Sequence, residues 1–394
     1  MLLTNVVHPR HGLTHLRIDG AAIQELGSEL HVAPAEASVD ARGALILPAF
    51  VDAHTHLDKS LIGLPWHPHA AGPSVADRIH NERAVLRELE VDSAVQSERL
   101  ARHMLARGTT HIRTHVDVVP EIGLRHFHGV MAAREQLRDL MHIQVVAFPQ
   151  LGVTRAPGTL KLLEEALANG AEVVGGLDPI SIDHDANSQL DAIFALADKY
   201  DAEVDIHLHD RGEMGATTVE LIAERTHALG LTGRVVVSHA FCLGDVDAAR
   251  QAALLDQLAE NDIAIMTHGP SGGVQSPPVR ALDERGVRVF SGSDGVRDAW
   301  GPLNTGDMLE RAFTVAYING FRDDAGLELS LRMVTYAGAQ VLGLEHYGIE
   351  PGDLADFVLV DARNEAEAVV LHPPRRAVYR QGKLVAGEDF NQRA

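Results

Sequence analysis

The chain has 394 residues, of which 45% are hydrophobic, and its formal net charge at pH 7 is -21. Nucleic acid and anionic membrane surfaces repel so acidic a protein, and we exclude both as partners. No signal-like segment opens the chain, no run of about 18 apolar residues occurs, and Cys242 is the single cysteine. We therefore expect a cytoplasmic protein without disulfides and without the Cys-x-x-Cys metal site of the zinc nucleobase deaminases.

The two ends of the chain share one sequence pattern, that of short β-strands. Residues 1–48 are short apolar alternations broken by glycine and proline, and LTHLRIDG and ALILP are the clearest strands. The last fifty residues repeat this pattern in ADFVLVDA, RAVYRQ and GKLVAG. We predict that residues 1–48 and 345–394 together form one small β-sandwich domain. Two separate β appendages are the alternative.

Residues 49–344 alternate between apolar strands and amphipathic helices that end near glycine or asparagine. Parallel strands need crossover helices, and eight of them close into a barrel without open edges. The pattern predicts a (β/α)8 TIM barrel. Its expected strands are Ala44–Val51, His111–Val116, Ile143–Phe148, Glu172–Leu177, Glu203–Ile206, Arg234–Ser238, Ile263–Met266 and Val287–Phe290.

The segment from Ser60 to Ile79 is rich in proline and glycine and follows the first expected strand. A connection of this length is long enough to act as a flap over a site. A passive surface loop is an equal alternative.

Polar residues follow five of the expected strands, on the side where a barrel carries its active site. A single histidine in such a place usually makes an ordinary hydrogen bond. Here, however, three imidazoles and one carboxylate coincide, and they suit a borderline divalent ion with one position open for water. The residues are His54 and His56, which share one side of an extended backbone, then Gln150, His207, His239 and Asp294. The other histidines, including His111, His115, His142 and His184, are interpreted as structural or surface residues.

Several blocks resemble the amidohydrolase superfamily, in particular the branch that holds the cytosine deaminases and the triazine N-alkylaminohydrolases. They are FVDAHTHLDKS, HIRTHVDVV, QVVAFPQLGV, DIHLHD, VVSHA, FSGSDGVRDAWGPLNTGDML and EHYGIEPGDLADFVLVDA, and they span nearly the whole chain. The resemblance implies that His54, His56, His207 and Asp294 bind the metal. It also implies that His239 polarises substrate and hydroxide, that Gln150 binds substrate, and that the protein is a homo-oligomer.

The chemistry of these residues agrees with the resemblance. A bound Zn²⁺, or Fe²⁺ as the alternative, lowers the pKa of its water and supplies hydroxide as the nucleophile. Asp294 could take the water proton through its second oxygen, and His239 could move protons near neutral pH. The binuclear members of the superfamily hold their metal ions with a carboxylated lysine. No lysine ends the third, fourth or fifth strand of this chain, so we expect one metal ion and not two.

Two positions depart from the pattern of the branch. Asp210 stands where a glutamate usually shuttles protons, and its side chain is one methylene shorter; His209 could share that role or face away. Gly295 stands where a second aspartate grips the substrate amine of the cytosine deaminases. Without that aspartate, a buried hydrogen bond to the substrate, typically worth ~1 to 3 kcal/mol, would be missing, which puts cytosine as substrate in doubt.

Three nearby side chains could supply substrate contacts, and two of them, Arg297 and Asp298, could replace the contact of the missing aspartate. Lys59, as in the triazine aminohydrolases, could meet a ring oxygen, although an exposed lysine is an equal interpretation. Arg297 and Asp298 follow Gly295 closely in the sequence. Trp300 is expected to pack within the protein and not to stack on the substrate, since a large aromatic side chain is usually mostly buried.

The sequence thus predicts a mononuclear metal-dependent aminohydrolase that displaces ammonia or an alkylamine from a small nitrogen heterocycle such as a pyrimidine, triazine or purine-like ring. Hydrolysis of a cyclic amide or urea C–N bond by the same metal hydroxide is the enzymatic alternative. A non-catalytic binding barrel is the third hypothesis, and it is disfavoured because no ligand is missing.

Overall fold

The computed structural model describes residues 1–269 and 274–387. Its larger part is a barrel in which eight parallel strands pair in chain order. An isolated bridge between Thr55 and Asp294 joins the last strand region to the first, so the barrel is nearly closed. The strands are β6 (Phe50–Thr55), β7 (Thr109–Asp117), β8 (His142–Phe148), β9 (Val173–Leu177), β10 (Glu203–Leu208), β11 (Val235–His239), β12 (Ala264–Met266) and β13 (Val289–Phe290).

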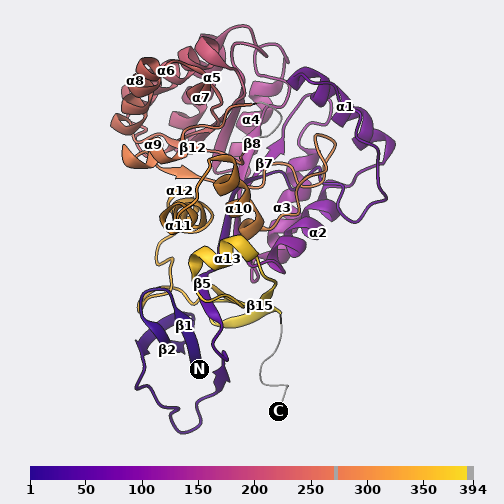
Figure 1. Cartoon of the computed structure of the whole chain (residues 1–394). Coiled ribbons are helices and arrows are strands. Elements are labelled where there is room, and N and C mark those ends of the chain that lie inside the picture. The colour runs from indigo at the N-terminus through magenta and orange to yellow at the C-terminus, as the bar shows by residue number, and fades with distance from the viewer. Residues whose placement is uncertain (270–273, 388–394) are drawn as a thin grey trace.

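Helices surround this barrel, as Figure 1 shows. Half of them begin at a side-chain cap: the Asp92 side chain, for example, accepts from the amides of Ala94 and Val95 at the start of α2. The helices are α1 (Val75–Glu88), α2 (Ser93–Leu105), α3 (Arg125–Leu137), α4 (Thr159–Ala168), α5 (Ala186–Tyr200), α6 (Gly212–Ala228), α7 (Cys242–Asp245), α8 (Ala248–Glu260), α9 (Val279–Glu284), α10 (Met308–Ile318), α11 (Asp324–Met333) and α12 (Tyr336–Val341). The prediction of a (β/α)8 barrel is confirmed.

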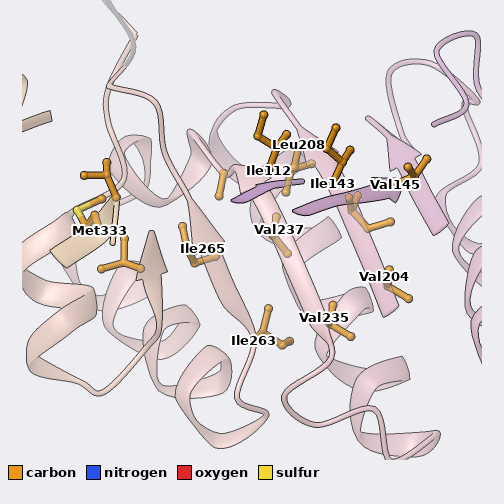
Figure 2. Packing of buried hydrophobic residues seen from close by; sticks show 14 of the residues in the cluster. Ile112, Ile143, Val145, Val204, Leu208, Val235, Val237, Ile263, Ile265 and Met333 are labelled. Atoms are coloured by element: carbon orange, nitrogen blue, oxygen red, sulfur yellow. The ribbon is translucent and has the colours of Figure 1, made fainter. Parts of the chain in front are cut away.

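The core lies between strands and helices because side chains alternate along each strand. On β10, Val204 and Leu208 belong to the large apolar cluster, together with Val235 and Val237 of the neighbouring strand (Figure 2). His207, which directly precedes Leu208 on β10, lies on the other side of the strand, in the barrel interior, where it meets His54 and Asp294. The alternation that buries valine against the helices therefore places a histidine inside the barrel.

Both ends of the chain build a second sheet, which lies below the barrel in Figure 1 together with α13 (Glu365–Leu371). β14 pairs antiparallel with β5, with Val358 opposite Leu47, so the two termini share one sheet and are not separate appendages. The domain boundaries at residues 48 and 345 stay a prediction. The strands are β1 (Leu2–His8), β2 (Gly12–Asp19), β3 (Ala22–Gly27), β4 (Ser38–Asp40), β5 (Leu45–Pro48), β14 (Phe357–Val360), β15 (Arg375–Arg380) and β16 (Lys383–Gly387).

The expected single strand Ala44–Val51 is wrong. Its first part is β5 of the small sheet and its end is the start of β6. The two strands meet at Ala49, whose carbonyl accepts a hydrogen bond from the Tyr347 hydroxyl at 2.6 Å. Both strands are fully buried, so the hydropathy shows no break between them. As a result His54 lies within β6, and only His56 follows the strand.

The segment from Ser60 to Ile79 crosses the strand ends and runs into α1, which begins at Val75. It is tied to the loop after β13: the Leu61 amide donates to the Arg297 carbonyl at 2.8 Å, and His69 Nε2 lies 2.8 Å from the Asp298 carbonyl. The segment is therefore part of the wall above the barrel, and its movement as a flap stays a prediction. None of the helices described has the length and hydropathy to cross a bilayer.

Candidate active site

Three histidines and one aspartate meet inside the barrel at the carboxyl ends of its strands. Ligand atoms of His54, His56, His207 and Asp294 all lie within 4.8 Å of one another. The Nε2 atoms of His54 and His56 are 3.7 and 3.4 Å from Asp294 Oδ1. The strand ends thus bring together all four residues that the sequence singled out as metal ligands.

Several nitrogens of this cluster have no hydrogen-bond partner in the described part of the chain. They include His54 Nε2 and both ring nitrogens of His207, which are buried. Burial lowers the pKa of His207 well below its usual value, and the neighbouring histidines lower it further, so the ring is neutral with a free lone pair. Burial alone would raise the pKa of Asp294, but His54 and His56 hold it well below its ordinary value. Imidazole rings with unpartnered nitrogens around one carboxylate fit a divalent cation.

A hydroxyl group holds His54 in one tautomer. Ser238 Oγ donates to Asp205 Oδ1 at 2.7 Å and lies 3.0 Å from His54 Nδ1. Because the hydroxyl proton is used on the carboxylate, Ser238 accepts from the His54 Nδ1–H group. The Nε2 atom of His54 then carries the lone pair that a metal needs.

Other histidines stand beside the four. The His115 ring, interpreted from sequence as structural, lies 4.0 Å from that of His54 between centroids. His268, which the sequence analysis did not single out, follows β12 and has its Nδ1 3.2 Å from His239 Nδ1 and 4.0 Å from Asp294 Oδ2. His268 follows the seventh barrel strand, and this position, like those of the polar residues after five other strands, is the sequence signal that identifies it.

His239 and Asp294 are held in an uncommon backbone conformation. Their φ angles are 72° and 58°, in the left-handed region that residues other than glycine seldom adopt. Such strain at two strand ends persists only where the surrounding structure enforces it, and it concentrates at functional sites.

The structure brings His209, and not Asp210, into the pocket beside the cluster. The His209 ring stacks on that of His239 at 4.4 Å, and its Nδ1 lies 2.7 Å from Asp178 Oδ2. Burial opposes a charge on His209, but Asp178 outweighs it and raises the pKa. The Asp210 carboxylate instead accepts from the Ser181 amide at 3.4 Å, and burial, with the nearby Asp178, raises its pKa.

The pocket at this cluster has a volume of about 40 Å³. Of the predicted substrate-binding residues, Lys59, Gln150 and Asp298 line it and Arg297 does not. Arg297 donates to the Leu64 carbonyl at 2.9 Å and so holds the segment after β6. The full lining is His56, Lys59, Phe148, Gln150, Leu177, His207, His209, Asp294, Gly295, Asp298 and Trp300.

Lys59 is only 2% exposed, so its interpretation as an exposed lysine is wrong. Its Nζ lies 3.1 Å from Asp117 Oδ1 and 3.3 Å from Glu82 Oε2. Burial disfavours the ammonium charge, but these carboxylates outweigh it and raise the pKa of Lys59. Glu82, which the sequence analysis missed, comes from α1 and also accepts from Gln150 Nε2 at 3.3 Å. Burial raises the pKa of Glu82 to about 8 although Lys59 acts against it.

Asp298 fills the space that a side chain at position 295 would take. A Cβ atom built on Gly295 would lie 1.9 Å from Asp298 Oδ2. Asp298 Oδ1 accepts from the amides of Trp300 and Gly301 at 2.8 and 3.1 Å, whereas Oδ2 has no hydrogen-bond partner in the part of the chain that the structure describes. Trp300 both packs and lines the pocket, since it contacts the apolar cluster that holds Phe148 and Leu177.

Comparison with known proteins gives consistent matches over nearly the whole chain. The family model described as "Amidohydrolase family" matches residues 37–386. The N-isopropylammelide isopropyl amidohydrolase of Pseudomonas sp. (strain ADP) is 32% identical over 89% of this chain and 88% of its own length. The crystal structure of N-isopropylammelide isopropylaminohydrolase from Burkholderia multivorans is 46% identical, covers 98% of both chains and superposes with a TM-score of 0.94. The 5-methylcytosine deaminase of Klebsiella pneumoniae, liganded with 5-fluorocytosine, is 26% identical over 99% and 98% of the two chains, with a TM-score of 0.88.

Proposed function

The chain belongs to the amidohydrolase family and is a hydrolase of C–N bonds, and we propose that it displaces an alkylamine or ammonia from a single-ring nitrogen heterocycle. The observation that carries the proposal is the small pocket itself. Three of the four candidate metal ligands, His56, His207 and Asp294, line its floor, and its wall carries Lys59, Gln150 and Asp298.

We assign one divalent metal ion to His54, His56, His207 and Asp294, with Zn²⁺ in first place and Fe²⁺ as the alternative. Such an ion, when bound, acidifies water and makes it a nucleophile at neutral pH. The unpartnered nitrogens of the cluster and the single tautomer of His54 support this assignment.

In the proposed reaction the oxygen of water bonds to a ring carbon, the exocyclic C–N bond breaks, and the amine leaves with a proton. Asp294 Oδ2, on the side of His268 and His239, takes the first proton. The His239 ring donates a hydrogen bond to the oxygen on which negative charge develops. His209 gives a proton to the leaving nitrogen, because its contact with Asp178 raises the pKa of the ring and so favours the protonated form. We give His209 the role that the sequence suggested for Asp210.

The wall selects a ring with alternating carbonyl and N–H groups. The Lys59 ammonium and the Gln150 amide offer donors to ring carbonyls, and the free Oδ2 of Asp298 accepts from a ring N–H. Phe148 and Leu177 present apolar surface to the ring faces. Dioxotriazines with one alkylamino group have this pattern, and the 46% identity to an enzyme named for N-isopropylammelide supports that choice.

Turnover by zinc-loaded protein tests the proposal, with ammonia, alkylamine and opened ring measured separately. The panel contains N-isopropylamino-dioxotriazine, cytosine, isoguanine, a pterin and a cyclic urea. We expect alkylamine from the first compound with a kcat/KM at least a hundredfold above the others. Opening of the cyclic urea without amine release would overturn the proposal, as would a fully metallated protein that acts on none of the five.

A further inference from the structure

A second and much larger cavity lies behind the wall of the catalytic pocket. Its volume is about 550 Å³, against about 40 Å³ for the pocket. It opens between α1 and the connection from β7 to α3. Its lining is mixed: Leu86, Ile122 and Leu151 form an apolar part, and charged side chains such as Arg83 and Arg125 form the rest. Gln150 lines both spaces, so the two cavities are separated by the thickness of a few side chains.

Glu82 and Asp117 form the partition. Both line the second cavity, and neither lines the catalytic pocket. On the other side they meet Lys59, and Glu82 Oε1 also accepts from Gln150 at 3.3 Å. Glu82 is 1% exposed, and its two carboxylate oxygens contact Lys59 and Gln150, each at 3.3 Å, so its side chain lies between the pocket residues and the second cavity.

The position of Glu82 is set by α1, outside the ring of barrel strands. A capping box of Ser74 and Asp77 fixes the start of this helix. Asn81, next to Glu82, donates to the Ala299 carbonyl at 3.2 Å, and Arg78 donates to the Trp300 carbonyl at 3.2 Å. The helix is therefore fastened to the loop that also carries Asp298, and Glu82 is held at a defined depth.

We propose that Glu82 determines substrate size: it positions Lys59 and Gln150 and closes the catalytic pocket against the second cavity, and so limits the substituent on the ring. The inference rests on the proposed function. Removal of the Glu82 side chain joins the two spaces, and the apolar residues Leu86, Ile122 and Leu151 then accept a bulky alkyl group.

The test compares zinc-loaded variants on isopropylamino-dioxotriazines that carry hydrogen, methyl or cyclohexyl on the ring nitrogen between the two carbonyls, which is the side of the ring that we assign to Lys59 and Gln150. In Glu82→Ala we expect the ratio of kcat/KM for cyclohexyl over methyl to rise at least about tenfold, the range that pocket volume usually controls. Glu82→Gln keeps the side-chain volume and should leave this ratio within about twofold, although absolute rates fall. Arg87→Ala, on the same helix and cavity but without contact to Lys59 or Gln150, is the matched control and should leave the ratio unchanged. An unchanged ratio in Glu82→Ala would overturn the proposal.

A crystal structure of zinc-loaded Glu82→Ala decides the same point without turnover. We expect one continuous cavity with Lys59 and Gln150 displaced; collapse of the neighbours into the gap would refute the partition. If the wild-type protein turned over none of the three compounds, the proposed function would fail while this structure still tested the inference. Should Glu82→Ala not fold, Glu82→Asp, shorter by one methylene, gives both readouts, with a rise in the ratio of about threefold expected.

Discussion

The two sides of the catalytic pocket are built in different ways. The side with the metal ligands consists of strand ends, where the register of parallel strands places His54, His207 and Asp294 around one point. The opposite side, with Lys59 and Asp298, is assembled from loops and from α1. Strand ends give a site its reactive centre with little freedom, whereas loops and an added helix set which ring fits. Changes on the first side should therefore stop the reaction, and changes on the second side should redirect it.

The largest effect is expected at the metal side. His207→Ala and Asp294→Asn each remove one ligand of a four-residue set and should lower kcat by more than about a thousandfold, with loss or misplacement of the metal. Metal content by elemental analysis, measured beside kcat, checks the expectation. Full activity in either variant would exclude the cluster as the reactive centre.

The next effect separates two adjacent residues. His209→Gln should lower kcat by about a hundredfold or more while the protein keeps its metal, since general acid catalysis contributes about that much. Asp210→Asn should change kcat by less than about fivefold, because its carboxylate lies outside the pocket lining. The reverse order of the two effects would return the proton transfer to Asp210.

A smaller effect on metal binding is expected from Ser238→Ala. The variant loses the acceptor that fixes the His54 tautomer, and loss of such a partner typically weakens metal binding by about 10 to 100 times. Competition with a chelator measures the metal Kd. Ser291→Ala is the matched control: it removes another buried serine, one that donates to the Thr267 carbonyl at 2.7 Å, and should leave the Kd unchanged.

On the recognition side, Asp298→Asn should raise KM by about tenfold and change kcat less. The variant replaces the unpaired Oδ2, which we expect to accept from a ring N–H, and the loss of one such hydrogen bond is worth ~1 to 3 kcal/mol. Steady-state kinetics on the isopropylamino-dioxotriazine gives both constants. A pure fall in kcat would show instead that Asp298 acts in the chemical step.

The smallest effect concerns stability and leaves the metal centre intact. Burial raises the pKa of Glu82 to about 8 in the folded chain from 4.5 when it is unfolded, so the folded state binds the extra proton between these values. The free energy of unfolding of the wild type should therefore fall as the pH rises through this window. The glutamine of Glu82→Gln cannot ionise. As the pH rises through this window, the unfolding free energy of the variant minus that of the wild type should therefore grow by at least about 1.4 kcal/mol, the value of one pKa unit. Urea unfolding at several pH values checks the sign; parallel curves would contradict it.

The same contrast governs what the sequence could predict. The HxH pair and the polar residues after the strands were identifiable because strand order alone decides where they meet. Asp210 was predicted from its position in the family motif, whereas in the structure β10 ends at Leu208 and His209, not Asp210, lines the pocket. Glu82 lies in DRIHNERAVLRELE, which has the composition of a solvated helix, and only the packing of α1 over the barrel buries it. The break between β5 and β6 was hidden because the apolar run Ala44–Val51 crosses it and both strands are buried along their whole length.

The most direct test of the account is a titration of metal-free protein with Zn²⁺, in which isopropylamine release from the isopropylamino-dioxotriazine is followed at each step. We predict no release without metal, a linear rise, and saturation at one equivalent per chain. Saturation at two equivalents, or release that does not depend on added metal, would contradict the single site formed by His54, His56, His207 and Asp294.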